Sequence, residues 1–270
     1  MNNNTSLNKK YYIKIRGVIL TMMLFYSPIH GFIHKVLVVA HEAGLWDKLD
    51  FVPVYPVKDG YSISSINPLH KVPTLVLDDY TVLYGSQTIA EYLDNNSISG
   101  KKLYPIEGKS RWDALRRLAL ADTVFEVTVV MALERLQSPP RDTVFSWNWP
   151  KVVRAVDKME EDSRVNSGDF DIGHASTLHA LSYLDRQTKR GLHKSIPVDW
   201  DWRNGRINLH KWFDEAVKRP SVTAHFNKEY LGDDSPEFCQ EKVAEVLRLQ
   251  GKNLPEKLTS HSVDFVPPGE

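Results

Sequence analysis

The chain has 270 residues, enough for one large domain or two modest domains with real cores. Its composition, 42% hydrophobic and 25% charged, is typical of a folded globular protein rather than a disordered one. Lysine plus arginine equal aspartate plus glutamate at 34 each, so no net field attracts nucleic acid or an anionic membrane. The single cysteine, Cys239, excludes an internal disulfide and a Cys-x-x-Cys redox pair. No apolar run approaches the ~18–20 residues that a transmembrane helix needs, so we expect a cytoplasmic enzyme or binding protein.

The first 21 residues begin with the polar segment MNNNTSLNKK and continue as YYIKIRGVIL, which has no acidic residue. A basic start followed by the apolar run 18–26 is similar to a signal peptide, but the run is short and lacks a cleavage site of small residues. A mitochondrial presequence and an upstream start codon before Met22 or Met23 are the alternatives. We expect residues 1–21 to be an N-terminal extension leading into the first strand.

Strand and helix signals alternate in the next segment. Residues 24–26 predict a strand that ends at Ser27. Apolar residues then recur on one face of a predicted helix over residues 32–43, which closes at Gly44. Residues 51–54 predict a second strand, placed at a sheet edge because Pro53 cannot donate a ladder hydrogen bond.

The stretch from residue 67 to 94 is the most informative part of the chain. Two short β-rich apolar runs, 74–77 and 81–84, are separated by Asp-Asp-Tyr and predict a hairpin. Pro73 precedes the first run, where a proline must begin a strand or form a special turn. Ser86 follows the second run and stands where an amphipathic helix should begin. Strand, helix, strand, irregular segment, hairpin and helix together predict a thioredoxin-like α/β domain with a mixed sheet.

The periodicity after this stretch is purely helical. Ser110, with Asp113 three residues on, is similar to a capping box and predicts the start of a long helix. Further helices are predicted around 152–159, over 172–184, over 207–217 and, in the tail, around 237–250. The expected divisions are an extension 1–21, a thioredoxin-like domain 22–97, a linker 98–108, an all-helical domain 109–230 and a tail 231–270.

The segment that combines Val72-Pro73, the hairpin and Ser-x-x-Ile-x-x-Tyr-Leu resembles the glutathione-binding half of the glutathione transferase family. DIGHASTLHALSYLD and KWFDEAVKRPSV resemble, more loosely, the core and terminal helices of its all-helical domain. The core helix of the family opens with a Ser/Thr-x-x-Asp box. Asp171 and His174 occupy the two positions here, so Asp171 can still cap, but the reciprocal carboxylate is absent. The resemblance implies a homodimer that uses glutathione as co-substrate.

The resemblance also implies a glutathione site. In the family the valine-proline bond is cis, which implies a cis bond between Val72 and Pro73 here. The backbone of Val72 would pair with the cysteinyl unit of glutathione. Ser86 would hold the γ-glutamyl carboxylate, which agrees with the anion preference of a helix N-terminus; otherwise Ser86 is only a helix cap. Lys71 either pairs with the glycyl carboxylate or is a solvated lysine. Gly85 stands where the family usually has an acidic residue for the amino group of the substrate.

Glutathione transfer requires the thiolate, and a free thiol has a pKa of ~8.5, so a hydrogen-bond donor must lower it. In the family this donor is a tyrosine, serine or cysteine at the junction of the first strand and helix. Related sequences of the Tyr-Ser-Pro type place it two residues after their proline. That proline is Pro28 here, so the donor position is occupied by His30. Three assignments remain open: His30 is the donor or acid–base catalyst, Ser27 or Tyr26 replaces it, or the catalytic hydroxyl is lost.

The second substrate is expected between the domains, against the long helix. Asp122 lies within the apolar stripe of that helix and is either a hydrogen-bonded structural group or a contributor to the site at the domain seam. The segment from Phe125 to Val130 and the aromatic residues Phe145, Trp147 and Trp149 are expected to offer an apolar wall.

These observations favour a glutathione transferase-like enzyme that attaches glutathione to a small lipophilic electrophile or uses it in isomerisation or reductive cleavage. The alternative is a non-catalytic protein of the same fold that carries a ligand or supports an assembly, because Gly85 and His30 both depart from the family. The histidines show no metal-ligand spacing and no nucleotide-binding glycine motif is present. We therefore expect no metal, no nucleic-acid partner and no membrane association.

Overall fold

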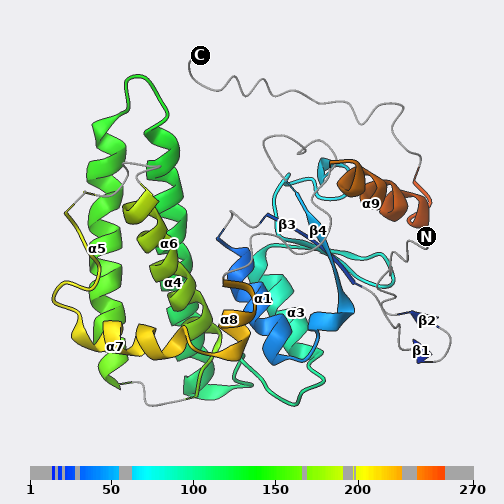
Figure 1. Ribbon diagram of the computed structural model, residues 1–270, viewed down its shortest axis with the longest axis horizontal. Helices are drawn as coiled ribbons and strands as arrows, with labels where there is room; N and C mark the ends of the chain where they lie inside the picture. The colour runs from blue at the N-terminus through cyan, green and yellow to red at the C-terminus, as the bar shows by residue number, and fades with distance from the viewer. Residues whose placement is uncertain are drawn as a thin grey trace, which may run out of the picture.

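The computed structural model describes residues 14–15, 18–19, 22–27, 31–54, 63–165, 169–190, 197, 199–226 and 236–252. A mixed four-stranded sheet with helices on both faces lies beside a bundle of long helices (Figure 1). Within the extension expected over residues 1–21, β1 (Lys14–Ile15) and β2 (Val18–Ile19) pair antiparallel. The thioredoxin-like fold with an all-helical second half is confirmed.

The sheet contains β3 (Met22–Tyr26), β4 (Leu49–Pro53), β5 (Thr74–Val76) and β6 (Val82–Tyr84) in the order β4-β3-β5-β6. Strand β3 runs parallel to β4 and antiparallel to β5, and β5 runs antiparallel to β6. The predicted hairpin is therefore present, and β4, which contains Pro53, lies at an edge as expected.

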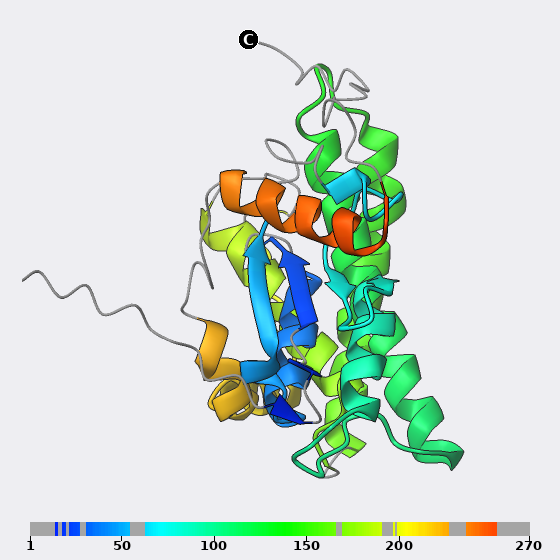
Figure 2. The ribbon, with the colours of Figure 1, turned by 90° about the vertical axis from the view of Figure 1, so that its right-hand side faces the viewer.

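Side chains that alternate along β3 enter two different apolar clusters. Leu24 and Tyr26 pack with α1 (Ile33–Glu42) and α3 (Ser86–Asn95) on one face of the sheet. Met23 and Phe25 pack on the opposite face, against α9 (Pro236–Leu249). Figure 2 looks toward this second face, with α9 in orange running across the strands. Because the side-chain period of a strand is two, both faces of β3 are buried.

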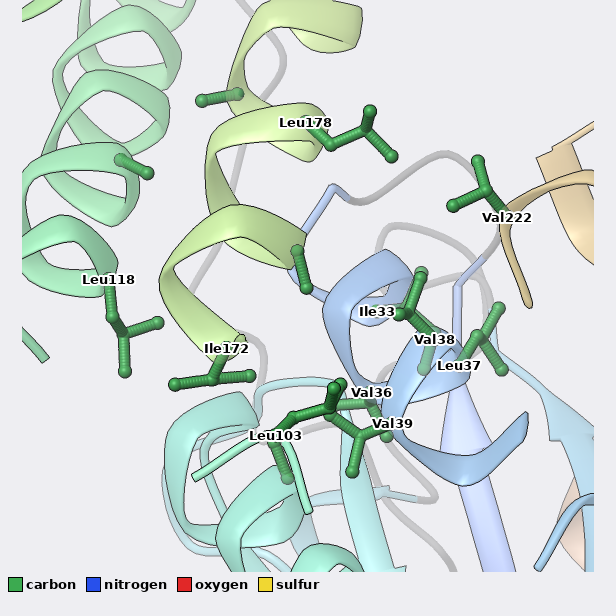
Figure 3. Close-up of a cluster of buried hydrophobic side chains, with 14 of the residues drawn as sticks. Ile33, Val36, Leu37, Val38, Val39, Leu103, Leu118, Ile172, Leu178 and Val222 are labelled. Atoms are coloured by element: carbon green, nitrogen blue, oxygen red, sulfur yellow. The ribbon is translucent and has the colours of Figure 1, made fainter. Parts of the chain in front are cut away.

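The second half consists of α4 (Gly108–Glu134), α5 (Asp142–Val165), α6 (Ile172–Arg190), α7 (Ile207–Ala216) and α8 (Pro220–Phe226). The main core is continuous from one half to the other. Figure 3 shows Val36 and Val39 of α1 beside Leu103 and Ile172, with Val222 of α8 on the far side of α1. Helix α1, followed by the 3-10 turn η1 (Trp46–Lys48), is thus enclosed by the sheet and by helices of both halves.

A buried carboxylate adds a polar link between the halves. Glu42, in the last turn of α1, accepts hydrogen bonds from Ser221 Oγ at 2.6 Å, Arg219 Nη2 at 2.9 Å and Lys101 Nζ at 2.9 Å. Burial raises the pKa of Glu42, but these three donors outweigh it and lower the pKa to about 2. Glu42 is therefore ionised over the whole neutral range.

The start of α4 differs from the expected capping box. The helix begins at Gly108, so Ser110 lies inside its first turn and donates to the carbonyl of Glu107 at 3.2 Å. The Asp113 carboxylate, which a capping box would turn back to the helix start, instead accepts from Lys109 Nζ at 2.5 Å. The prediction was wrong because a local ion pair takes up that carboxylate.

The start of α6 keeps its reciprocal capping bond in another form. His174 N donates to Asp171 Oδ1 at 3.0 Å, and Asp171 N donates back to His174 Nδ1 at 3.1 Å. An imidazole nitrogen thus replaces the missing carboxylate as the acceptor. Burial raises the pKa of Asp171, but its hydrogen bonds with His174 and the charge of Arg117 lower it overall.

Candidate functional site

Strand register brings three of the expected site segments to one edge of the sheet, the edge formed by the ends of β3 and β6 and the start of β5. Phe25 pairs with Thr74, and Thr74 pairs with Tyr84. Ser27, which follows β3, Val72-Pro73, which precedes β5, and Gly85-Ser86, which follows β6, therefore lie at the same end of neighbouring strands. The N-termini of α1 and α3 also face this edge, because each helix begins just after one of these strands. The arrangement concentrates free backbone N–H groups at one place.

Ser27 is completely buried at the end of β3. Its hydroxyl has no hydrogen-bond partner among the residues that the structure describes. Tyr26, the other hydroxyl considered at this junction, packs its ring edge-on against Phe51 at 6.0 Å in the core. His30 lies outside the described residues. The Ser27 hydroxyl therefore has capacity for a further hydrogen bond.

The loop before β5 is organised by Asn67, which the sequence did not single out as a site residue. Its Nδ2 donates to the carbonyl of Lys71 at 2.8 Å and to Thr74 Oγ1 at 2.7 Å, while its Oδ1 accepts from Leu69 N at 2.9 Å. Thr74 Oγ1 also donates to the carbonyl of Lys71 at 2.8 Å. These bonds hold the backbone immediately before Val72, and an asparagine in a loop ahead of a strand is the signal that would have identified them.

The Val72-Pro73 bond is cis, as the resemblance implies. Pro73 is buried and Val72 is half-buried, whereas the side chain of Lys71 is exposed and directed to solvent. The Lys71 carbonyl is thus bonded to Asn67 and Thr74, while the Lys71 side chain remains accessible to solvent.

Helix α3 begins at Ser86, as predicted, directly after Gly85. The backbone of Gly85 has φ 82° and ψ 137°, a conformation that favours glycine. A Cβ added there would meet no atom within 4 Å, so the constraint comes from the backbone conformation and not from lack of space. Ser86 is buried, and the first N–H groups of α3 have no partner within the helix. This terminus can accept a carboxylate.

A buried polar network connects α1, α3 and α4 just behind this terminus. Asp122 of α4 accepts a hydrogen bond from Lys35 Nζ and a second one, at 2.9 Å, from Gln87 Nε2. The side chain of Lys35 is fully buried and that of Asp122 is 7% exposed. Burial lowers the pKa of Lys35, although the charge and hydrogen bond of Asp122 oppose the shift. Asp122 therefore fixes the residue that follows Ser86.

Lys35 and Gln87 were not predicted as members of the site. Each of Lys35 and Asp122 interrupts an apolar helix, and a lone charge in such a stripe needs a partner. The two interruptions were the available signal, but their pairing required the packing of α1 against α4.

Phe125 lies at the seam between the halves and is 3% exposed. Its ring packs edge-on against Phe32 at 4.4 Å and Tyr183 at 4.4 Å, and lies 5.2 Å from the ring of His179. Gly31 completes this contact, because a Cβ on it would lie 2.2 Å from Phe125 and 2.4 Å from His179. The ring of Phe125 is thus covered by its neighbours.

The three aromatic residues expected to extend this wall contact different partners. Phe145 lies beneath the guanidinium of Arg135 and Trp147 beneath Lys151 Nζ, while Trp149 packs edge-on against Trp200. The side chain of Trp147 is 71% exposed. Phe145 and Trp149 are partly buried against the main core. That these residues, with the segment from Phe125 to Val130, form an apolar wall for a second substrate stays a prediction.

Two further features are absent from the part of the chain that the structure describes. No three histidine, cysteine, aspartate or glutamate side chains gather there in a group able to hold a metal ion. None of the helices there is long and apolar enough to cross a membrane.

Comparison with known proteins identifies relatives of this architecture. Residues 31–96 match the family model for the glutathione S-transferase N-terminal domain. Among solved structures, a glutathione transferase family member from Pseudomonas fluorescens Pf-5 with bound glutathione is 30% identical, with a TM-score of 0.68. The match covers 76% of this chain and 98% of that one. No curated protein matches the chain.

Two more solved structures have similar coverage. The Pseudomonas fluorescens Pf-5 family member with bound S-(propanoic acid)-glutathione is 29% identical with a TM-score of 0.63, covering 76% of this chain and 96% of that one. A glutathione S-transferase from Methylobacillus flagellatus with glutathione bound is 26% identical with a TM-score of 0.68, covering 76% and 98%.

Proposed function

Because this chain belongs to the glutathione transferase family, we propose that it is an enzyme that binds glutathione at the sheet edge described above. It attaches the glutathione thiolate to a small lipophilic electrophile, or uses it in isomerisation or reductive cleavage. The observation that carries this proposal is the convergence of Ser27, Val72-Pro73 and Gly85-Ser86 at one end of the sheet. The relatives crystallised with glutathione support the same ligand.

Three parts of glutathione have chemically matched partners at this edge. The γ-glutamyl carboxylate binds Ser86 and the free N–H groups at the start of α3, where the helix dipole favours an anion. The main chain of Val72 pairs with the cysteinyl unit, and the exposed ammonium of Lys71 pairs with the glycyl carboxylate. Gly85 offers no side chain to the amino group. The second substrate approaches at the seam near Asp122 and Phe125, which shape the site rather than react.

We propose that Ser27 activates the thiol. A buried hydroxyl without a partner among the described residues gains a hydrogen bond when it donates to a thiolate, which favours the ionised form. His30 remains the competing donor, because a histidine side chain can donate a hydrogen bond and act as an acid–base catalyst. The two differ in pH dependence, since a serine hydroxyl keeps its proton throughout the working range and a histidine does not.

Three measurements test this function in sequence. Retention on immobilised glutathione tests the site, and conjugation of a chloronitrobenzene tests the chemistry. Titration of thiolate absorbance in the glutathione complex then compares Ser27→Ala with His30→Ala, and the variant that raises the apparent thiol pKa identifies the donor. If the protein does not bind glutathione, and Ser86→Ala changes stability alone, the enzyme assignment is overturned.

The runner-up is a non-catalytic ligand carrier or assembly protein of the same fold. Gly85 favours it, because the site lacks the acidic side chain that would hold the amino group of glutathione. Binding without turnover of any generic electrophile, together with unchanged thiol pKa in both variants above, would support this alternative.

We further propose that the functional unit is a cytoplasmic homodimer, with the domain divisions 22–97 and 109–230 on either side of the linker 98–108. Size-exclusion chromatography with light scattering tests the oligomeric state, and a mass near 30.9 kDa, that of one chain, would refute the dimer.

A further inference from the structure

The expected tail contains a helix that is part of the core. Helix α9 places four side chains on its inner face in the buried cluster on the outer side of the sheet: Cys239, Val243, Val246 and Leu247. They pack with Met23 and Phe25 of β3, Val52 of β4 and Val76 of β5. The spacing of these positions on α9 is that of one helical face. Helix α9 therefore covers apolar side chains of β3, β4 and β5 on this face of the sheet.

The same cluster extends to the loop before β5 that Asn67 organises. Ile63 and Ile66, which lead directly into Asn67, are buried members of it. Val72, the residue whose backbone is proposed to pair with glutathione, packs its half-buried side chain against it. The loop that Asn67 organises is therefore supported at both ends by a cluster that α9 completes.

Polar contacts fix α9 at its middle and just after its end. Midway along the helix, Lys242 Nζ lies 3.2 Å from Asp50 Oδ2 of β4. Just after its end, Gln250 Nε2 donates to the carbonyl of Tyr80, in the turn between β5 and β6, at 2.9 Å. The helix is thus held in register across the sheet, from the edge strand β4 to the hairpin that leads to Ser86.

We propose that α9 is a positioning element of the glutathione site. Its apolar face holds Ile66 and Val72 in place, and through them the main chain that binds the cysteinyl unit. Leu247 is then a positioning residue for glutathione, although it touches neither glutathione nor the reacting atoms. This inference rests on the proposed function.

The test uses two leucines of α9 that differ in burial. Leu247 is 3% exposed, whereas Leu249, two residues on, is 45% exposed. In the full-length protein, Leu247→Ala leaves a gap beneath the loop, and Leu249→Ala is the matched control with the same chemical change. We expect Leu247→Ala to raise the Kd and KM for glutathione by at least about threefold, with kcat and the KM for the electrophile unchanged. Leu247→Met, which refills the volume, should restore the affinity.

A purely stabilising role for α9 gives a different result. In that case Leu247→Ala lowers the melting temperature but leaves the Kd for glutathione equal to that of Leu249→Ala, and the proposal is overturned. Amide hydrogen exchange over residues 67–76 provides a readout without ligand. Exchange over these residues that is faster in Leu247→Ala than in Leu249→Ala, with exchange in α4 equal in the two variants, supports the positioning role even if the wild-type protein fails to bind glutathione, an outcome that would refute the proposed function alone. Equal exchange over residues 67–76 in the two variants, or exchange that is faster to the same extent in α4, overturns the inference.

Discussion

Replacing Asp122 with alanine removes the carboxylate that accepts hydrogen bonds from both Lys35 and Gln87. Lys35 is then left fully buried without its counter-charge, and Gln87 loses the bond that holds it at the start of α3. We expect two consequences, a large loss in the free energy of unfolding and weaker binding of glutathione at Ser86.

The magnitude follows from the burial of the pair. Because the Lys35 side chain is fully buried and that of Asp122 is 7% exposed, solvent screening of their interaction is weak. Removing one partner of such a pair costs about 3–5 kcal/mol, since the remaining group is desolvated without compensation. Lys35→Met removes the charge while filling a similar volume, so the variant with both substitutions should be much less destabilised than the sum of the two single variants.

A double-mutant cycle measures this effect. Urea unfolding followed by tryptophan fluorescence gives the free energy of unfolding for the wild type, Asp122→Ala, Lys35→Met and the double variant. We expect a coupling energy of about 2 kcal/mol or more. If the two single effects add to within about 0.5 kcal/mol, Lys35 and Asp122 do not act as a unit and the reasoning fails.

The pH dependence provides an independent check. The pKa of Lys35 is lowered from 10.5 in the folded protein, so between the two values the unfolded state binds more protons. Stability arising from this group therefore rises with pH toward 10.5 and is lowest below the folded pKa. The difference in stability between the wild type and Lys35→Met should follow this rise, and a difference independent of pH would contradict it.

Three further predictions follow from the seam and from the helix starts. Glu42→Gln should be less stable than wild type at neutral pH. Because the pKa of Glu42 is about 2 rather than 4.5, this difference should vanish as pH falls from about 5 to 2 in acid-unfolding curves. Gly85→Glu and Gly85→Ala should both lose about 1–3 kcal/mol of unfolding free energy from backbone strain. Gly85→Glu alone should bind glutathione about tenfold more tightly than Gly85→Ala by calorimetry, and equal affinities would show that no amino group approaches. Gly31→Ala should lower stability by about 1–3 kcal/mol in thermal unfolding, since its Cβ would overlap Phe125 and His179, and an unchanged midpoint would contradict the packing.

Local sequence signals were sufficient for the elements that form the site. The hairpin, the helix start at Ser86 and the edge position of the strand with Pro53 were all predicted, because each depends on a few neighbouring residues. The helix predicted around 237–250 also exists, as α9. Its apolar face could be recognised from spacing, but the sheet face that it covers could not, because the two are distant in the chain.

The residues that were missed depend on tertiary contacts. Lys35 and Gln87 acquire their roles only when α1, α3 and α4 meet at Asp122. The capping box predicted at the start of α4 was wrong, because the Asp113 carboxylate accepts from Lys109, one turn earlier in the helix. At α6, the imidazole of His174 performs a role for which the sequence pattern offered only a carboxylate. Side-chain competition of this kind is decided by geometry that a pattern does not contain.

The enclosure of α1 has a consequence for the order of events during synthesis. The sheet and α1 are made first, but the helices that cover α1 come later in the chain: α6 begins at residue 172 and α8 at residue 220. The other face of the sheet is covered later still, because α9 begins at residue 236. A nascent chain that ends within the linker therefore exposes apolar surface on both sides of its first folded unit. Such an intermediate is prone to aggregation and is a natural client for chaperones until the last helix has left the ribosome.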